Sequence, residues 1–200
     1  MADTNRVQYG LSNCHVAVQT ENVNAETGAV TYSYATQYAL PGAVSVAFSA
    51  QANNSPFYAD NRIYFQPTKN NGYQGDLTIA KSNDWFRKNV LGDIEDSGGA
   101  MVENADVEAK KFALLFEFEG DAHKVRHVLY NCSVTRPGIN GNTTNESITP
   151  DTQTLTLTAM PRADGVIHAY ASPTDTAYAE WYTTVFVPQG AANTGGGTGG

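Results

Sequence analysis

Ser97 has the neighbours of a nucleophilic serine, because it lies in the string Asp96-Ser97-Gly98-Gly99. Serine hydrolysis also needs a histidine that takes the hydroxyl proton and a carboxylate that orients the histidine. His15 is the single histidine that precedes Ser97, and its surroundings match no such role. We therefore interpret the string as an acidic turn that follows a helix.

Histidine and carboxylate pairs occur at spacings that do not suit a metal or an acid–base pair. His123 and His127 are four residues apart, which on a strand is about 13 Å and too far for one ion. Glu117 and Glu119 share a strand face and could in principle form a glycosidase pair, but we interpret them as solvent-facing. The acidic residues near position 95 lack the spacing of a calcium loop. The sequence therefore predicts a protein that is not an enzyme, with no catalytic residue, cofactor or metal site.

Residues 111–137 predict a long β-hairpin around which the other elements are organised. The first strand alternates large apolar residues with others, which is the period of a strand. Residues 120–123 supply the turn. On the return strand the same alternation predicts that Val128, Tyr130, Cys132 and Val134 face one side. The hairpin has two faces to cover.

Other segments complete a mainly β fold with a minor helical part. Helix signals predict one helix over residues 82–92, capped by Ser82 or Asn83 and ended by Gly92. A shorter helix is predicted to run to Tyr182, with Thr174 or Asp175 as its cap. Alternation predicts strands at residues 7–11, 15–20, 30–40, 43–49, 76–81, 153–160, 166–171 and 185–187.

Composition narrows the function classes. The 200 residues carry a net charge of −8, which argues against a protein that grips nucleic acid through Lys and Arg but not against one that lets DNA pass. Two cysteines make no disulfide framework, and we expect reduced thiols. No secretory signal or membrane anchor is expected, because residues 1–20 lack an apolar run and no segment is long enough to span a bilayer.

Residues 51–75 combine turn formers with the aromatic residues Phe57, Tyr58, Tyr64, Phe65 and Tyr73. Two interpretations stay open. A long hairpin that inserts into a partner has this composition. A loop whose aromatic side chains fold back on their own core has it too.

An ordered set of strings resembles the major tail protein, the tail-tube subunit, of long non-contractile-tailed phages (siphophages) and prophages of Gram-positive bacteria. The most specific strings are FYADN (57–61), VENAD (102–106) and FALLFEFEGD followed by RHVLYNC, and the resemblance runs from about Arg6 to Pro188. None of these strings is a catalytic motif.

The resemblance implies a tail-tube-like β-sandwich or partial barrel with one flanking α-helix, long loops and terminal arms. It implies hexameric rings that stack into a tube, the conduit for DNA ejection, with the tape-measure protein, tail terminator and tail-tip proteins as partners. The expected location is the virion tail, after synthesis in the bacterial host cytoplasm. We predict one tail-tube domain over residues 1–188, with an N-terminal arm and a long loop at 50–75, and a flexible Gly-rich tail at 189–200.

The loop at 50–75 is the predicted contact between subunits or rings. The alternative hypothesis is a carbohydrate- or receptor-binding β-sandwich module of the tail tip, because Tyr and Trp side chains can stack on sugars. The residues predicted for the interface are Phe57, Tyr58, Asp60, Asn61, Tyr64, Phe65 and Tyr73.

Overall fold

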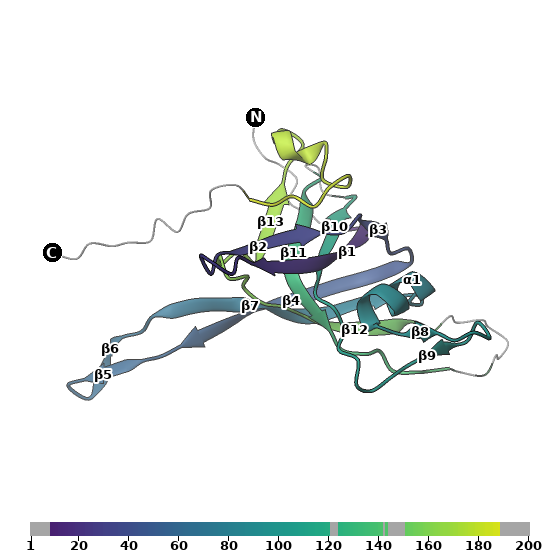
Figure 1. Cartoon of the computed structure of the whole chain (residues 1–200). Helices are drawn as coiled ribbons and strands as arrows, with labels where there is room; N and C mark the ends of the chain where they lie inside the picture. The colour runs from purple at the N-terminus through teal and green to yellow at the C-terminus, as the bar shows by residue number, and fades with distance from the viewer. Residues whose placement is uncertain (1–8, 121–123, 142, 144–150, 189–200) are drawn as a thin grey trace.

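The computed structural model describes residues 9–120, 124–141, 143 and 151–188. Three predicted features lie wholly or partly outside the described residues: the start of the N-terminal arm, residues 121–123 of the central turn, and the Gly-rich tail at 189–200. Most of residues 137–151, whose Asn, Gly and Thr content also predicts a loop, lie outside them too. The described part is mainly β, as predicted, with one short helix (Figure 1).

A nine-stranded antiparallel sheet forms most of the protein. Its main path runs β2-β1-β10-β11-β12-β7-β4, with β13 beside β11 and β3 beside β1. Two separate two-stranded ribbons are β5–β6 and β8–β9. The strand bounds are β1 Leu11–Val23, β2 Val30–Tyr34, β3 Tyr38–Ala39, β4 Ala43–Asn54, β5 Phe57–Ala59, β6 Arg62–Phe65, β7 Thr68–Ile79, β8 Ile94–Glu95, β9 Met101–Val102, β10 Phe112–Phe118, β11 Arg126–Val134, β12 Gln153–Ala159 and β13 His168–Ala171.

The sheet curls so that its two halves enclose the main core. Leu114 of β10, Leu77 of β7 and Leu155 of β12 are fully buried in this core together with Val16 of β1. Burial of apolar surface from both halves holds the curl closed. The described residues therefore form a mainly β fold whose curled antiparallel sheet encloses a core, in line with the β-sandwich or partial barrel that the resemblance implies.

A second core lies on the other face of β10 and β11. Ala113 and Leu115 point into it from β10, and Trp181 covers it from the C-terminal segment. Both faces of β10 are thus buried, and all residues from Phe112 to Glu117 are buried. This confirms the prediction that the hairpin packs against other parts of the chain on both of its faces.

The helix starts and ends where the sequence indicates. α1 (Asp84–Phe86) continues directly as the π-helical turn η1 (Arg87–Leu91). Asn83 caps its first turn by accepting from Phe86 N at 2.9 Å, and Gly92 ends it with φ 81°. Phe86, Val90 and Leu91 close one end of the main core.

Asparagine residues with positive φ interrupt the alternation of two strands. Asn13 has φ 51° and makes a bulge, so the two strands predicted at 7–11 and 15–20 are one strand, β1, in the described residues. Asn131 has φ 49° in β11. The prediction that Val128, Tyr130, Cys132 and Val134 share one side is wrong for this reason: Val128 and Tyr130 face the second core, and Cys132 and Val134 face the main core.

The C-terminal segment has less regular structure than predicted. The helix predicted to reach Tyr182 is a single 3-10 turn, Thr176–Tyr178. Asp175 does not cap it; its carboxylate accepts from Ser172 N at 2.7 Å instead. Arg126 Nη1 donates to the Tyr178 carbonyl at 2.5 Å, and a continuing α-helix needs that carbonyl for its own ladder. Residues 185–187 are not a strand, although Val185 is buried.

Candidate functional site

A two-stranded arm projects from the body and is the most prominent surface feature (Figure 1). β7 pairs with β12 only from Tyr73 to Ile79, whereas β4 and β7 stay paired outward to Asn54 and Thr68. We define the arm as residues 51–72. With a rise of about 3.3 Å per residue, each side of the arm reaches roughly 30 Å beyond the sheet.

Two glycines allow the close strand approach at the base of the arm. A Cβ on Gly75 would lie 1.9 Å from the Ala47 carbonyl oxygen, and a Cβ on Gly72 would lie 2.1 Å from the Ala159 carbonyl oxygen. Gly72 also has a backbone φ of 118°, a value that residues other than glycine rarely adopt. These glycines therefore allow β7 to run close to β4 and β12 at the point where the arm leaves the sheet.

The end of the arm is a tight hairpin turn. Ala59 pairs with Arg62, so Asp60 and Asn61 are the two central residues of the turn. Their φ values are 51° and 58°. Positive φ at both positions is what a type I′ turn requires, and it is a turn whose twist matches that of the paired strands.

The large apolar side chains of the tip point into solvent. Phe57 pairs across the strands with Phe65, and Tyr58 pairs with Ile63. Phe57 is 60% exposed, Tyr64 68% and Phe65 62%. These side chains cover no core of their own chain, so the interpretation in which the loop folds back is wrong for the tip. Monomeric proteins rarely leave such a patch uncovered unless it binds something.

Six of the seven predicted interface residues lie together on this tip: Phe57, Tyr58, Asp60, Asn61, Tyr64 and Phe65. Tyr73 does not. It lies on β7 at the base of the arm, packs against the main core and meets His168 edge-on at 6.2 Å. Ile63, 52% exposed, belongs to the tip but was not predicted, because the selection followed aromatic residues. Ile63 could have been included from the sequence, because it lies between Arg62 and Tyr64 in the same segment as the predicted aromatic residues.

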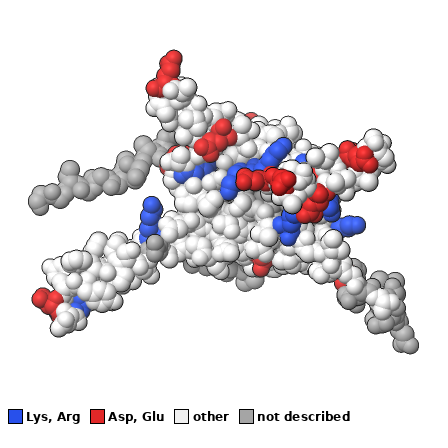
Figure 2. Space-filling model, turned by 60° about the horizontal axis from the view of Figure 1, so that its bottom comes forward, with Lys and Arg blue, Asp and Glu red and all other residues white. Residues whose placement is uncertain are grey.

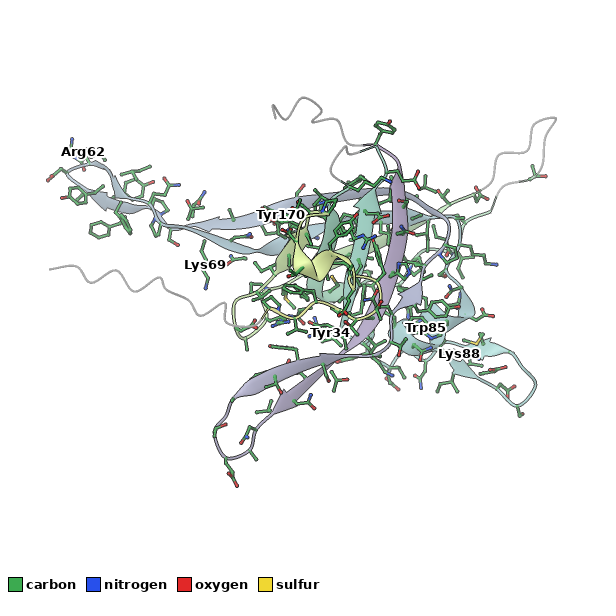
Figure 3. The ribbon with its side chains drawn as sticks, turned by 90° about the horizontal axis from the view of Figure 1, so that it is seen from above. Tyr34, Arg62, Lys69, Trp85, Lys88 and Tyr170 are labelled. Carbon is green, nitrogen blue, oxygen red and sulfur yellow. The ribbon has the colours of Figure 1, made fainter. Side chains whose placement is uncertain are left out.

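Charged groups are sparse on the arm. Figure 2 shows it mostly white, with acidic and basic atoms at its end and a basic group near its base. Arg62 is at the end of the arm and Lys69 is on the part nearer the body (Figure 3). The tip therefore has an apolar patch with the charged residues Asp60 and Arg62 at its edge. Protein-binding surfaces have this composition.

The outer face of β4, β7 and β12 is an uncovered sheet face. Thr156 lies beside Asp76, and its hydroxyl donates to the Asp76 carboxylate at 2.8 Å. Thr154 faces outward while Leu155 and Leu157 face the core, as the sequence predicts. We call this surface the hydroxyl face, and it comprises Ser45, Ala47, Ser49, Gln74, Asp76, Thr78, Thr154, Thr156 and Thr158.

One prediction for this sheet is wrong. Strict alternation over residues 43–49 predicts that Val44 shares a face with Val46 and Phe48, but Val44 is 58% exposed, whereas the other two pack on the main core. The register shifts between Ala43 and Ser45, so the alternation starts only after this irregularity.

The groups considered for catalysis lie apart from the arm and serve the fold. Ser97 lies in the turn between β8 and β9, and its hydroxyl donates to Asp96 at 3.0 Å. Glu117 is buried, not solvent-facing as predicted: Arg126 Nε donates to it at 3.0 Å. His127 Nδ1 lies 3.2 Å from His168 Nε2, and burial lowers the pKa of His168. His123 is outside the described residues.

Asp93 links the segment after the helix to the rest of the protein through two ion pairs. Its carboxylate accepts from Arg87 Nε at 2.8 Å and from Arg136 Nη1 at 2.6 Å. Burial by itself favours a higher pKa, but these two arginines outweigh burial, and the pKa of Asp93 is lowered. This acidic residue is therefore structural.

Among the described residues no helix is long and apolar enough to cross a membrane, and no three or more His, Cys, Asp or Glu side chains are grouped so that they could hold a metal ion. No protein-family model matches the chain, and no curated protein matches its sequence. A similar solved structure is the cryo-EM structure of the anti-feeding prophage cap, described as a tube-terminating cap. The TM-score is 0.42 and the identity is 11%, over 85% of this chain and 96% of that chain. This distant likeness does not assign the chain to a family.

Proposed function

We propose that the chain is a structural protein of a phage tail that assembles with copies of itself into hexameric rings, and that these rings stack into the tail tube. The ordered strings that resemble the major tail protein family support this proposal. The exposed aromatic arm carries it, because a folded subunit with such an arm has a surface that another subunit can cover.

Ring formation uses the edges of the sheet. The main path of the sheet ends in β2 on one side and in β4 on the other. Edge strands expose backbone N–H and C=O groups, which pair readily with an edge of another chain. We propose that such edge-to-edge pairing links the subunits of one ring.

The hydroxyl face lines the lumen in this proposal. Among its nine residues, Asp76 is the single ionisable one. A wall without Lys or Arg leaves no cation to hold phosphates, and a ring of carboxylates repels them. DNA can thus pass without specific binding. The second core and the C-terminal segment then lie on the outside of the tube, because they cover the face of β10 and β11 that points away from the main core.

The proposed partners follow from the same role. They are further copies of this chain, the tape-measure protein, the tail terminator and the tail-tip proteins. The protein is made in the bacterial host cytoplasm and ends in the virion tail. We propose no enzymatic activity for it.

The test replaces the tip apolar groups and leaves the sheet intact. The variant Phe57→Ser with Tyr64→Ser and Phe65→Ser is expected to fold normally, because these side chains are exposed. It is expected to form no tubes, whereas the unsubstituted protein forms rings or hollow tubes at high concentration. Negative-stain electron microscopy and light scattering after size exclusion measure both outcomes.

Tyr170→Ser is the matched control. Tyr170 is 66% exposed but lies on β13, away from the arm (Figure 3). It should leave assembly unchanged. Normal tubes from the triple variant refute the role of the arm, and an unsubstituted protein that never assembles, even with tail-tip complex added, refutes the tube proposal.

The alternative function is a carbohydrate- or receptor-binding module of the tail tip. Exposed Tyr58 and Tyr64 favour it, because aromatic faces stack on sugar rings. Glycan-array binding by a protein that stays monomeric would establish this alternative. Loss of that binding in Tyr64→Ser would locate it on the arm.

A further inference from the structure

We infer that the tip of the arm docks on the opposite end of the same sheet in a second copy of this chain. The inference rests on the proposed function and identifies the surface that receives the arm. We call this surface the sheet pole, and it comprises Pro41, Gly42, Ala43, Ala80 and Lys81.

The arm and the sheet pole lie at the two ends of β4 and β7. β4 starts at Ala43 and runs out into the arm, and β7 returns from the arm and ends at Ile79. Ala80 N donates to the Gly42 carbonyl at 2.7 Å, which ties the two ends together at the pole. Trp85 and Lys88 of the adjoining helix lie on the side of the body away from Arg62 (Figure 3). A straight ribbon cannot bend its tip back to its own pole, so the occupant must come from another copy.

Two hollows flank the sheet pole. One has a volume of about 270 Å³ and lies between the bulge of β1 and residues 39–43. The other has a volume of about 340 Å³, and Lys81, Arg87 and Ile139 are among its lining residues. A cavity of about 150 Å³ can hold a benzene ring. Each hollow therefore has room for one aromatic side chain of the tip.

The chemistry of the hollows suits the tip. Leu11 and Leu40 line the smaller hollow, and Ile139, which is 98% exposed, lines the larger one. In the smaller hollow Ser12 Oγ is buried and has no hydrogen-bond partner among the described residues. A tyrosine hydroxyl from the tip can satisfy it if docking turns the Ser12 side chain toward the hollow, because the oxygen has almost no accessible surface in the isolated chain. Lys81 gives the larger hollow a positive group that Asp60 can approach, whereas Arg87 is already paired with Asp93, and Asp151 also lines this hollow.

A contact between two different ends of one molecule leaves both ends free to repeat it. Such a head-to-tail contact generates an open stack, whereas a contact between two identical patches stops at two copies. The arm and the pole are opposite ends of the same two strands, so each docking step propagates along the strand direction. Stacked rings require this geometry.

Disulfide cross-linking tests the inference. The variant pairs Arg62→Cys on the tip with Ala80→Cys on the pole. We expect a ladder of covalent multimers on non-reducing gels after mild oxidation of assembled particles, and monomer alone at dilutions where no particles form. Cys14 and Cys132 are buried, and burial raises the pKa of each thiol to about 12, so they give little background.

The matched control pairs Arg62→Cys with Ala25→Cys in the turn between β1 and β2, which is also exposed. It should give no ladder. If particles form but the ladder of covalent multimers appears only with the control pair, or with neither pair, the arm does not dock on the sheet pole. That result does not contradict the proposed function. An unsubstituted protein that forms no particles overturns the proposed function and this inference with it.

A charge reversal gives a second readout that does not need cross-links. Lys81→Glu should raise the protein concentration needed for assembly by roughly tenfold, because it faces Asp60 with a like charge. Lys110→Glu makes the same change at another exposed lysine and should alter that concentration less than about twofold. Equal effects of the two substitutions refute a specific role for Lys81.

Discussion

Arg126 and Glu117 form an ion pair across the β10–β11 ladder, with 3.0 Å between Arg126 Nε and Glu117 Oε2. The guanidinium also lies 3.8 Å from the centre of the Tyr178 ring and donates to the Tyr178 carbonyl. One arginine therefore neutralises a buried carboxylate and fastens the C-terminal segment to the sheet. It also links a strand to a segment that has little regular structure of its own.

Replacing this arginine should destabilise the protein. Arg126→Ala leaves Glu117 buried without its cation, and we expect the free energy of unfolding to fall by about 3 kcal/mol. Arg126→Lys keeps the charge but loses the planar fork and the ring contact, so its effect should be smaller. Urea unfolding followed by tryptophan fluorescence measures both. Arg62→Ala at the exposed tip is the control and should change stability by less than about 0.5 kcal/mol.

Asp93 should make stability depend on pH in the acid range. Its pKa in the folded protein is lowered, whereas the unfolded chain has the ordinary value near 4, so the unfolded state takes up the proton first as pH falls. The stabilisation is complete above about pH 4 and is lost as pH drops through the folded pKa. Asp93→Asn should cost about 2 kcal/mol at pH 7, since hydrogen bonds to charged groups are lost. The difference from the parent protein should shrink below pH 4; a difference that stays constant contradicts the assignment.

Two glycine substitutions should differ sharply. Gly75→Ala places a Cβ 1.9 Å from the Ala47 carbonyl oxygen, and a backbone atom cannot move aside without separating β4 from β7. We expect a loss of at least about 3 kcal/mol or no folded protein. Gly28→Ala has φ 68° but no atom within 4 Å, so only the backbone cost of about 1 kcal/mol applies. Thermal unfolding of the two variants compares them, and similar melting temperatures would refute the steric argument.

The thiols of Cys14 and Cys132 should not react with thiol reagents while the protein is folded. Both are buried, and desolvation raises the pKa of each to about 12, so almost no thiolate exists at neutral pH. Labelling with a thiol reagent should follow the unfolding transition in urea and not precede it. Rapid modification of either thiol in buffer would show that the main core opens locally.

The arm illustrates what can be predicted from sequence. Aromatic residues among turn formers leave two interpretations open, a projecting hairpin and a loop that folds back on the core. Asp60 and Asn61 are residue types that tolerate the positive φ of a tight turn. Whether the aromatic side chains point outward depends on where the hairpin leaves the sheet. That point is fixed by β12, which pairs with β7 as far as Tyr73 and no farther. Tyr73 was therefore included among the predicted interface residues although it packs on the main core.

The bulge in β11 depends on a distant residue. Gln19 of β1 accepts from Asn131 N at 3.1 Å and donates to the Asn131 side chain at 3.3 Å. These bonds stabilise the positive φ that shifts Cys132 to the other core. A period-two pattern carries no information about such a partner, so the alternation was extended through the bulge. Glu117 was misplaced for a similar reason, since Arg126 becomes its neighbour only when the hairpin closes.

The strand order has a consequence for synthesis on the ribosome. β4 and β7 are joined through the β5–β6 hairpin and can pair early, but β12, the other neighbour of β7, is translated only after β10 and β11. Until then the apolar side chains of Leu77 and Ile79 have no cover, and the aromatic tip is already exposed. A nascent hairpin with two uncovered apolar surfaces is prone to aggregate with its neighbours. The rate at which β10–β12 are made and docked therefore determines how long the nascent chain stays prone to aggregation.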